Sequence, residues 1–337
     1  MPYAISVMRA LVQHFDQKID CVCWDENKRT PFIPTDEPGI TFHKRSTFDK
    51  QSIIKFIEQR NPTIMYISGR MDRLYLDAVL HFRGKVKIVT GSDAQWEDNN
   101  KQKISAFLGQ QLYRKYFDYF WVPGQRQYEF ARRMGYANNK IIGNLLTADT
   151  AVFEGPYQDH SDAKRRYYPH NLVYAGRFAK TKGIDILIDA FVAAKKELNS
   201  DWELTLVGSG DEVSSKESFI HVKGFMSGQE LAQGSKNWGA FCLPSVKEPW
   251  GVVIHEFAML GMPIVCSDNV GAADGLVINN YNGHIFRSGD RDSLKASLIR
   301  LMSASDDTLF EMGRRGYELS KKQSPLIAAY SLMSILS

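Results

Sequence analysis

Strand-like and helix-like segments alternate regularly through the second half of this chain. Short apolar runs predict buried strands, and longer runs with helical periodicity predict the helices that connect them. The predicted strands are Asn171–Ala175, Trp202–Val207, Ile220–Val222, Ala240–Leu243 and Ile264–Cys266, and the predicted helices are Ile184–Leu198, Val252–Leu260 and Leu294–Met302. This order is typical of a parallel sheet with helices on both faces. Such sheets bind ligands at the carboxyl ends of their strands, so we expect the functional residues there.

The first half has the same α/β character with a weaker pattern. Its predicted strands are Ile19–Trp24, Ile64–Ile67, Val86–Thr90 and Phe120–Val122, and its predicted helices are Pro2–Phe15, Gln51–Gln59, Leu74–Phe82, Ala106–Tyr116 and Gln125–Met134. A chain of 337 residues is long enough for two domains at roughly 150 residues each. A polar, tyrosine-rich stretch at about 149–170 is interpreted as the linker between them.

The basic residues are distributed unevenly along the chain. Residues 1–150 contain 22 Lys and Arg against 16 Asp and Glu, whereas residues 151–337 contain 20 against 22. A basic first half suits an anionic membrane surface or a phosphorylated acceptor, and scattered solvated charge explains it equally well. The four cysteines, Cys21, Cys23, Cys242 and Cys266, lie mostly in apolar runs without metal-type spacing. A reducing cytoplasmic location fits them, and no apolar run approaches the ~20 residues that span a bilayer.

Two carboxylates frame a predicted junction between a loop and a helix. Glu248 precedes the helix Val252–Leu260, Glu256 lies more than one turn inside it, and Gly251 occupies the turn. Backbone N–H groups and a partial positive charge at a helix start form an anion site. The two carboxylates therefore reach different parts of a ligand whose anionic group lies at the helix start, as in a sugar nucleotide.

Four segments occur in an order that resembles a known family. The segments Val173–Phe191, Leu204–Asp211, Val222–Glu230 and Phe241–Asp268 are similar to the donor half of retaining GT-B glycosyltransferases of the Glu-x7-Glu type, group 1 or family 4. The resemblance is close over about 170–290 and loose before it. It implies an α/β fold of two Rossmann-like domains facing a cleft: an acceptor-side domain at 1–150, a linker at 151–168, a nucleotide-sugar domain at 169–310, and a helical segment at 311–337 that crosses back.

The beginning of the chain departs from this family. Pro2–Phe15 is predicted as a helix that leads into the strand Ile19–Trp24, whereas relatives place a strand and a glycine-rich loop before that helix. Either the natural start lies upstream, or the first domain has one strand fewer. Loss of that strand would also remove a loop that lines the active cleft.

The resemblance assigns roles in donor binding and catalysis. Arg177 and Lys182 match the cations that bind the diphosphate, Glu248 matches the residue that contacts the donor sugar, and Glu256 matches the acceptor of ribose hydroxyls. Lys180 is a further candidate cation. The other residues expected around the donor are Gly176, Gly208, Gly224, Phe225, Trp250, Gly251, Val252 and Val253. The last three are expected to supply backbone N–H groups at the start of the helix.

Other motifs are weaker. Gly208-Ser209-Gly210 lacks the third glycine of a dinucleotide fingerprint, because position 213 is valine. Asp290 and Asp292 have the spacing of an Asp-x-Asp metal motif, but a helix cap is the favoured interpretation. In the first half, Asp93 takes the place of a histidine found in many relatives and is either a catalytic hydrogen-bonding group or a helix cap. His255 is expected to pack rather than to catalyse.

Together these features predict an enzyme. We expect it to transfer a hexosyl unit, with retention, from a UDP- or GDP-sugar to a glycan or lipid-linked saccharide, in the assembly of surface polysaccharide such as lipopolysaccharide. The expected enzyme needs no metal or other cofactor, binds no nucleic acid, and is cytoplasmic with possible peripheral contact at the inner face of the membrane. The alternatives are a GT-B epimerase or phosphorylase, or a sugar-nucleotide-binding protein with impaired catalysis.

Overall fold

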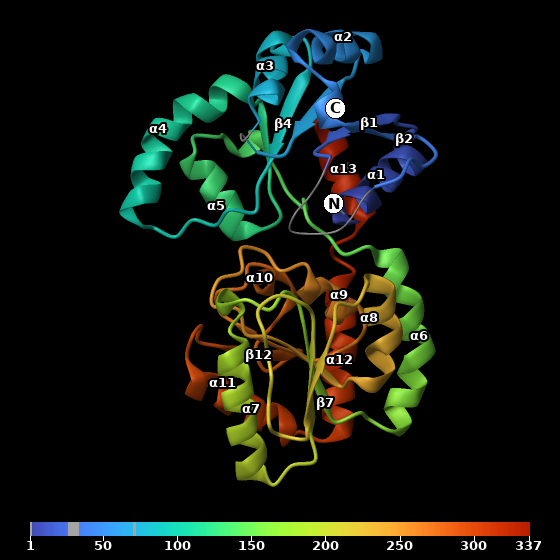
Figure 1. Cartoon of the computed structure of the whole chain (residues 1–337), viewed down its shortest axis with the longest axis vertical. Helices are drawn as coiled ribbons and strands as arrows, with labels where there is room; N and C mark the ends of the chain where they lie inside the picture. The colour runs from blue at the N-terminus through green and yellow to red at the C-terminus, as the bar shows by residue number, and fades with distance from the viewer. Residues whose placement is uncertain (1, 26–33, 70–71) are drawn as a thin grey trace. The chain divides into compact units, whose positions relative to one another are not determined.

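A computed structural model describes residues 2–25, 34–69 and 72–337. The chain divides into two compact units, each of which is described by itself (Figure 1). Unit 1 consists of residues 1–147 and 325–337, and unit 2 consists of residues 148–324.

Unit 2 is built on a six-stranded sheet whose neighbouring strands are all parallel. In spatial order the strands are β12 (Gly283–Phe286), β11 (Ile264–Ser267), β10 (Ala240–Leu243), β7 (Asn171–Ala175), β8 (Glu203–Val207) and β9 (Ile220–Lys223). The chain extends the sheet from β7 through β8 and β9 and then returns to the other side of β7 with β10. The strand order therefore reverses at β7, and open α/β sheets bind ligands beside such a reversal.

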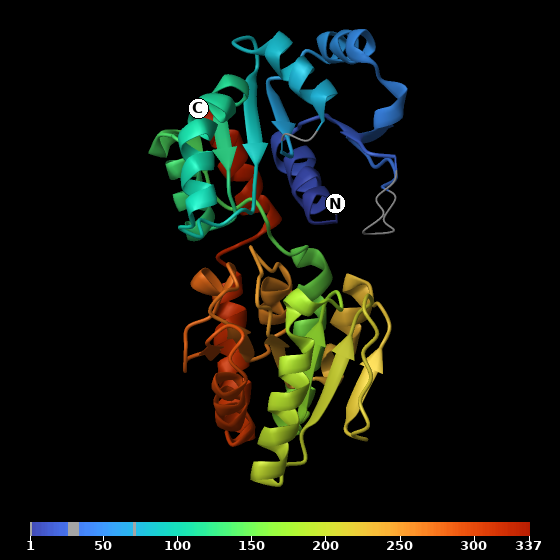
Figure 2. The same cartoon turned by 60° about the vertical axis from the view of Figure 1, so that its left-hand side comes forward.

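Helices cover both faces of this sheet (Figure 2). One face carries α7 (Ile184–Leu198) and α11 (Arg291–Met302), and the other carries α8 (Gly228–Gly234), α9 (Val253–Met259) and α12 (Asp306–Ser320) (Figure 1). The strands β7, β10 and β11 are apolar almost throughout because both faces are buried. Phe257 of α9 stacks on Phe241 of β10 with ring centroids 4.0 Å apart, which fixes this helix against the sheet.

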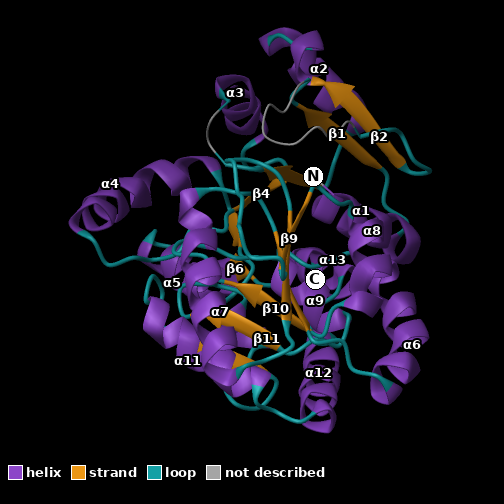
Figure 3. Ribbon diagram, turned by 60° about the horizontal axis from the view of Figure 1, so that its bottom comes forward, coloured by secondary structure: helices purple, strands orange, loops and turns teal. Residues whose placement is uncertain are grey.

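Unit 1 contains two separate parallel sheets among its described residues (Figure 3). One sheet has the strands β3 (Ile64–Ile67), β4 (Lys87–Gly91), β5 (Tyr119–Trp121) and β6 (Ile141–Ile142), and the other pairs β1 (Ile19–Cys23) with β2 (Ile40–Lys44). The helices are α1 (Pro2–Phe15), α2 (Lys50–Arg60), α3 (Arg73–Phe82), α4 (Asn100–Tyr116) and α5 (Gln125–Arg133). The predicted helix Pro2–Phe15 is confirmed as α1.

The final helix returns to unit 1. Helix α13 (Pro325–Met333) packs against α1 (Figure 1). Ala328 and Leu332 of α13 share a buried cluster with Val7 and Leu11 of α1. The core of unit 1 is therefore completed by residues from the far end of the chain.

Two expected boundaries are wrong. The stretch 151–168, interpreted as a linker, forms most of helix α6 (Thr150–Arg166), which packs on α8 and α9 within unit 2. The internal Pro156 and many polar residues hide the helical pattern, yet Phe153 is buried. The segment 311–337 does not cross back as a whole, because α12 stays in unit 2 through Ser320 and the return begins at Pro325.

Candidate functional site

The predicted donor residues of unit 2 gather at the carboxyl ends of its central strands. Gly176 and Arg177 directly follow β7, Gly208 follows β8, and Gly224 with Phe225 follows β9. Backbone hydrogen bonds join these loops: Gly176 N–H to Val207 O is 3.0 Å, and Gly208 N–H to Lys223 O is 3.2 Å. The three loops therefore form one continuous edge, along which the Phe225 side chain is 71% exposed.

Lys182 and Glu248 lie 66 residues apart in sequence and contact each other directly. Lys182 Nζ donates a hydrogen bond to a carboxylate oxygen of Glu248, and the two side chains are only 16% and 14% exposed. The contact depends on the packing of two loops. Thr181 O accepts hydrogen bonds from Val246 N–H at 2.9 Å and from Lys247 N–H at 3.3 Å. The pair is held together by backbone bonds rather than by its own charge alone.

Gly183 permits this approach of the two loops. Its φ is +65°, and a Cβ atom at this position would lie 2.5 Å from the carbonyl oxygen of Pro244. Any larger residue would therefore be strained in its backbone and would push the loop after β10 away. Glycine at position 183 is required by the same packing that brings Lys182 to Glu248.

Glu248 is fixed further by groups around it. Ser245 Oγ, which is fully buried, donates to the Glu248 carboxylate at 3.3 Å. The backbone around Glu248 is bonded to the segment after β11, with Gly271 N–H to Glu248 O at 3.2 Å and Ala272 N–H to Trp250 O at 2.9 Å. Trp250 is 4% exposed and anchors this turn in the core. The carboxylate of Glu248 is thus presented from a turn that is held on both sides.

Helix α9 begins directly after this turn. The first helical hydrogen bonds run from Ile254 N–H to Gly251 O at 3.0 Å and from His255 N–H to Val252 O at 2.8 Å. The N–H groups of Gly251, Val252 and Val253 come before these bonds, at the positive end of the helix dipole. Glu256 lies one turn further on and is 6% exposed. Because this residue is buried, the access of its carboxylate to a ribose stays a prediction.

His255 has a structural role, as the sequence analysis expects. Ala148 N–H donates to His255 Nδ1 at 2.9 Å, and His255 Nε2 donates to Ser320 O at 3.0 Å. Both ring nitrogens are thereby used by backbone groups where the chain enters unit 2 and where α12 ends. The imidazole must be neutral to accept one bond and donate the other.

This neutral histidine predicts an acid-sensitive unit 2. Burial lowers the pKa of His255 to about 4, although its bond to Ser320 O opposes the shift. Since an unfolded histidine titrates near ~6.5, the unfolded chain takes up the proton first as pH falls. The contribution of His255 to the free energy of unfolding is therefore fully present above pH ~6.5. About 3 kcal/mol of it is lost as the pH falls towards ~4. Urea unfolding across this range should show a steeper loss in the wild type than in His255→Gln; equal slopes would contradict the assignment.

Two residues without a recognisable sequence signal, Tyr174 and Ser245, support the site. Tyr174 is buried in β7, and its hydroxyl donates to Arg177 O at 2.8 Å. Burial raises the pKa of Tyr174, and the charge of Glu248 raises it further. Ser245 is the second supporting residue. Tyr174 lies within an apolar strand and Ser245 directly after one, so the sequence around them gives no sign of a polar role.

Asp93 belongs to unit 1. It is exposed on the loop after β4, and its carbonyl accepts a bond from Gln127 Nε2 at 3.3 Å. The helix that follows begins at Asn100 and is capped by Asn99, so the alternative that Asp93 caps a helix is wrong. A catalytic role for Asp93 stays a prediction.

The Asp-x-Asp sequence is a helix cap, as expected. Asp290 accepts hydrogen bonds from the N–H groups of Asp292 at 3.0 Å and Ser293 at 2.9 Å at the start of α11. Among residues 2–25, 34–69 and 72–337, no group of three or more His, Cys, Asp or Glu side chains is arranged to hold a metal ion.

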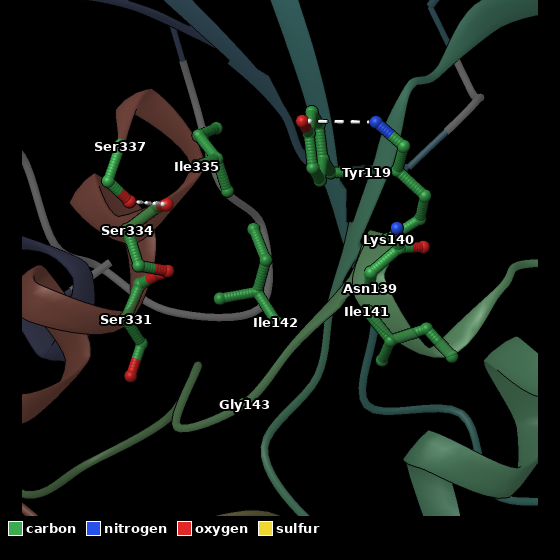
Figure 4. A pocket seen from close by; sticks show the side chains of 10 residues that line it. All are labelled: Tyr119, Asn139, Lys140, Ile141, Ile142, Gly143, Ser331, Ser334, Ile335 and Ser337. Carbon is green, nitrogen blue, oxygen red and sulfur yellow. Dashed lines mark hydrogen bonds between the residues drawn. The ribbon is translucent and has the colours of Figure 1, made fainter.

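A cavity of about 430 Å³ lies elsewhere, in unit 1 beside β5 and β6. Tyr119 and Lys140 lie on one side of it, and Ser331, Ser334 and Ser337 lie on the other (Figure 4). Lys140 Nζ donates to the Tyr119 hydroxyl at 3.1 Å. None of the residues predicted for donor binding or catalysis lines this cavity.

Comparison with known proteins agrees with the geometry of unit 2. Residues 168–319 match the family model described as glycosyl transferases group 1. An uncharacterized glycosyltransferase of Methanocaldococcus jannaschii is 29% identical over 197 residues, which cover 56% of this chain and 53% of that protein. The GtfA subunit of the UDP-N-acetylglucosamine–peptide N-acetylglucosaminyltransferase of Streptococcus pneumoniae is 26% identical over 208 residues, covering 58% and 39%. The matches thus span about half or less of these relatives.

Solved structures show the fold of the whole chain. Sucrose-phosphate synthase from Thermosynechococcus elongatus has a TM-score of 0.72 at 15% identity, over 99% of this chain and 92% of the other. Anabaena HepE in complex with UDP and glucose has a TM-score of 0.72 at 12% identity, covering 100% and 96%. The chain therefore has the GT-B fold of two Rossmann-like units, as predicted.

Proposed function

Because residues 168–319 match the family model of group 1 glycosyl transferases, we propose that this protein transfers a hexosyl unit from a nucleoside diphosphate sugar to a hydroxyl of a glycan or lipid-linked saccharide. The observation that supports this proposal most is the contact between Lys182 and Glu248 beside the start of α9. A cation for a leaving diphosphate and a carboxylate for the sugar lie together at the strand ends where such sheets bind ligands.

In the proposed reaction, charge develops on the leaving diphosphate. Lys182 supplies a point charge and Arg177 a planar guanidinium to its oxygens, and the N–H groups at the start of α9 bind the same group. These donors are fixed before the reaction, so they need little reorganisation as the charge grows. Glu248 contacts the sugar and stabilises positive character at its anomeric carbon. The leaving phosphate assists attack on the same face, which retains the anomeric configuration.

The proposed donor is a UDP-sugar, with a GDP-sugar as the second candidate. The comparison structures of Anabaena HepE contain UDP with glucose or UDP-glucose, and that of pneumococcal GtfA contains UDP and GlcNAc. The nucleobase is proposed to lie against Gly224 and Phe225, where the exposed Phe225 ring offers a stacking surface. The carboxylate of Glu256 is proposed to accept hydrogen bonds from the ribose hydroxyls.

Calorimetric titration with UDP, GDP, ADP and their hexose conjugates tests the donor site. We expect selective binding of one nucleotide, and about tenfold or greater weakening in Arg177→Ala and in Glu256→Ala through the diphosphate and the ribose. Lys196→Met, an exposed change on α7, is the control and should bind as the wild type does. Wild-type affinity in both Arg177→Ala and Glu256→Ala would refute the assignment of the donor site. Isomerisation or phosphorolysis of the donor would instead support the alternative functions, an epimerase or a phosphorylase.

The fixed cations also predict that no metal is required. Transfer assayed with the cognate donor and acceptor should keep its rate when EDTA is added in excess, because Arg177 and Lys182 bind the diphosphate directly. The matched control is Arg177→Ala with and without Mg²⁺. A strong loss of wild-type activity with EDTA, restored by Mg²⁺, would contradict this prediction.

We propose further that the acceptor is part of a surface polysaccharide assembled at the inner face of an anionic membrane. No described helix is both long and apolar enough to cross a bilayer. Helix α4 instead carries two exposed apolar side chains, Ile104 at 62% and Phe107 at 81%, with Arg114 and Lys115 in its last turn. This combination of apolar and basic residues suits peripheral binding to a membrane that contains acidic lipids.

Vesicle sedimentation tests the membrane proposal. The protein should bind vesicles of phosphatidylcholine mixed with phosphatidylglycerol, and binding should fall about tenfold in Ile104→Glu/Phe107→Glu because two apolar anchors are lost. Tyr167→Glu, which changes an 84% exposed aromatic residue of unit 2, should leave binding unchanged. Equal loss in both variants, or no dependence on phosphatidylglycerol, would reject α4 as the membrane contact.

A further inference from the structure

The cavity beside β5 and β6 belongs entirely to unit 1 (Figure 4). One wall comes from the start of β5 and the segment 139–143, and the other comes from the end of α13 and the short helix Ser334–Leu336. Its volume of about 430 Å³ lies within the range of ~300–1,000 Å³ that is typical of sites for small molecules. Asn139 and Ser334 line the cavity and are exposed, so a dissolved molecule can reach it.

The wall formed by β5 and the segment 139–143 offers hydrogen-bond donors. Lys140 Nζ lies 3.1 Å from the Tyr119 hydroxyl and 4.2 Å from the centroid of the Tyr119 ring, so this ammonium group is held in place. Because the Tyr119 hydroxyl accepts the bond from Lys140, it can donate its own proton to a ligand, and the ammonium group has further N–H donors. Lys140 is the one charged side chain among the described residues that line the cavity.

The opposite wall offers hydrogen-bond acceptors. Ser334 Oγ donates its proton to Ser331 O at 2.8 Å, and Ser337 Oγ donates its proton to Ser334 O at 2.6 Å. A hydroxyl whose proton is used in this way offers its lone pairs to a ligand. Ser331 Oγ already has two partners, Ile327 O at 2.9 Å and Asn144 Nδ2 at 3.0 Å. The oxygens of Ser334 and Ser337 are therefore the acceptors of this wall.

The two walls together select the chemical class of the ligand. An apolar molecule would displace water from Lys140 without replacing its hydrogen bonds, which is unfavourable. An anion suits Lys140, but it only accepts hydrogen bonds and would face the lone pairs of Ser334 and Ser337. A cation suits these two oxygens, but Lys140 would repel it. A sugar hydroxyl both donates and accepts, so a polyhydroxylated molecule satisfies both walls at once.

We propose that this cavity is a binding site for a neutral mono- or disaccharide. The sugar hydroxyls accept hydrogen bonds from Lys140 and Tyr119 and donate hydrogen bonds to the serine oxygens of the opposite wall. Ile142 and Ile335, which are buried and lie between the two walls in Figure 4, give the C–H groups of the sugar an apolar floor. None of the residues proposed to bind the sugar nucleotide lines this cavity, so the proposal does not depend on the donor site.

An NMR titration of the full chain, labelled with ¹⁵N, tests the site. The neutral probes are methyl α-glucoside, methyl β-galactoside and maltose, and the anionic probe is inorganic phosphate. At least one of the sugars should shift the amide signals of Gly143 and Ser334 in a saturable manner, with a Kd on the order of 1 mM. The absence of a saturable shift with every sugar, or tighter binding of phosphate than of the sugars at these signals, would overturn the proposal.

Variants separate the two walls and separate this site from the donor site. Lys140→Met removes a donor and Ser334→Ala removes an acceptor, so each should weaken sugar binding about fivefold or more. Lys55→Met, which changes an exposed lysine of α2, is the matched control and should bind as the wild type does. Glu248→Gln should keep the sugar-induced shifts at Gly143, and their loss in this variant would overturn the proposal. Equal affinity in Lys140→Met, Ser334→Ala and the wild type would also overturn it.

Discussion

Lys182→Met should lower kcat/KM for sugar transfer by about 100-fold or more. The substitution removes the cation that contacts Glu248 and that we place on the leaving diphosphate. Loss of a single preorganised donor to developing negative charge costs roughly 100- to 1000-fold in other enzymes. Steady-state kinetics should show most of the loss in kcat, because the charge grows only in the transition state.

A matched change distinguishes this role from simple loss of positive charge. Lys196→Met removes an exposed lysine of α7 in the same unit and should keep kcat/KM within about threefold. Glu248→Gln keeps the size of the side chain and removes its charge. If Lys182→Met and Lys196→Met have the same modest effect, then Lys182 does not act on the diphosphate.

Gly183→Ala should destabilise unit 2 and disable the site together. The new Cβ lies 2.5 Å from Pro244 O, and the residue must keep a φ of +65°. Backbone strain and displacement of the loop together should cost about 2–4 kcal/mol in the free energy of unfolding. Since the loop after β10 carries Glu248, kcat/KM should fall by about tenfold or more in the fraction that folds. Urea unfolding and kinetics on the same samples measure both effects.

Gly289 provides the control for this prediction. Its φ is +74°, but no atom lies within 4 Å of a Cβ built there, so Gly289→Ala contains the strain without the collision. This variant should lose about 1 kcal/mol of stability and keep its activity. Equal destabilisation and equal activity in the two variants would show that the approach of Pro244 to Gly183 is unimportant.

Most of the sheet in unit 2 is predictable because it is buried on both faces. Continuous apolar runs such as Ala240–Leu243 leave little choice but a central strand. Prediction failed where the pattern is mixed. Strand β2 (Ile40–Lys44) has one buried residue, Ile40, and its other four residues are partly or fully exposed, so polar residues interrupt its apolar pattern. The sequence of helix α6 has the pattern of a linker, because its polar residues and Pro156 conceal the face that packs on α8 and α9.

The site was predictable as a set of strand ends but not as a set of contacts. Sequence order places Arg177, Lys182 and Glu248 on loops at one edge of the sheet. The contact between Lys182 and Glu248 depends on the backbone bonds of Thr181 to the loop after β10, which no local pattern reveals. Tyr174 lies inside an apolar strand, where its hydroxyl had no visible function. Tertiary hydrogen bonds, rather than local propensity, decided these positions.

The return of α13 to unit 1 has a consequence for synthesis on the ribosome. Residues 325–337 leave the ribosome after all of unit 2, yet they complete the cluster formed by α1. Unit 2 can therefore acquire its native core while unit 1 still exposes apolar side chains such as Val7 and Leu11. The half of the protein that is made first is therefore expected to reach its native core last.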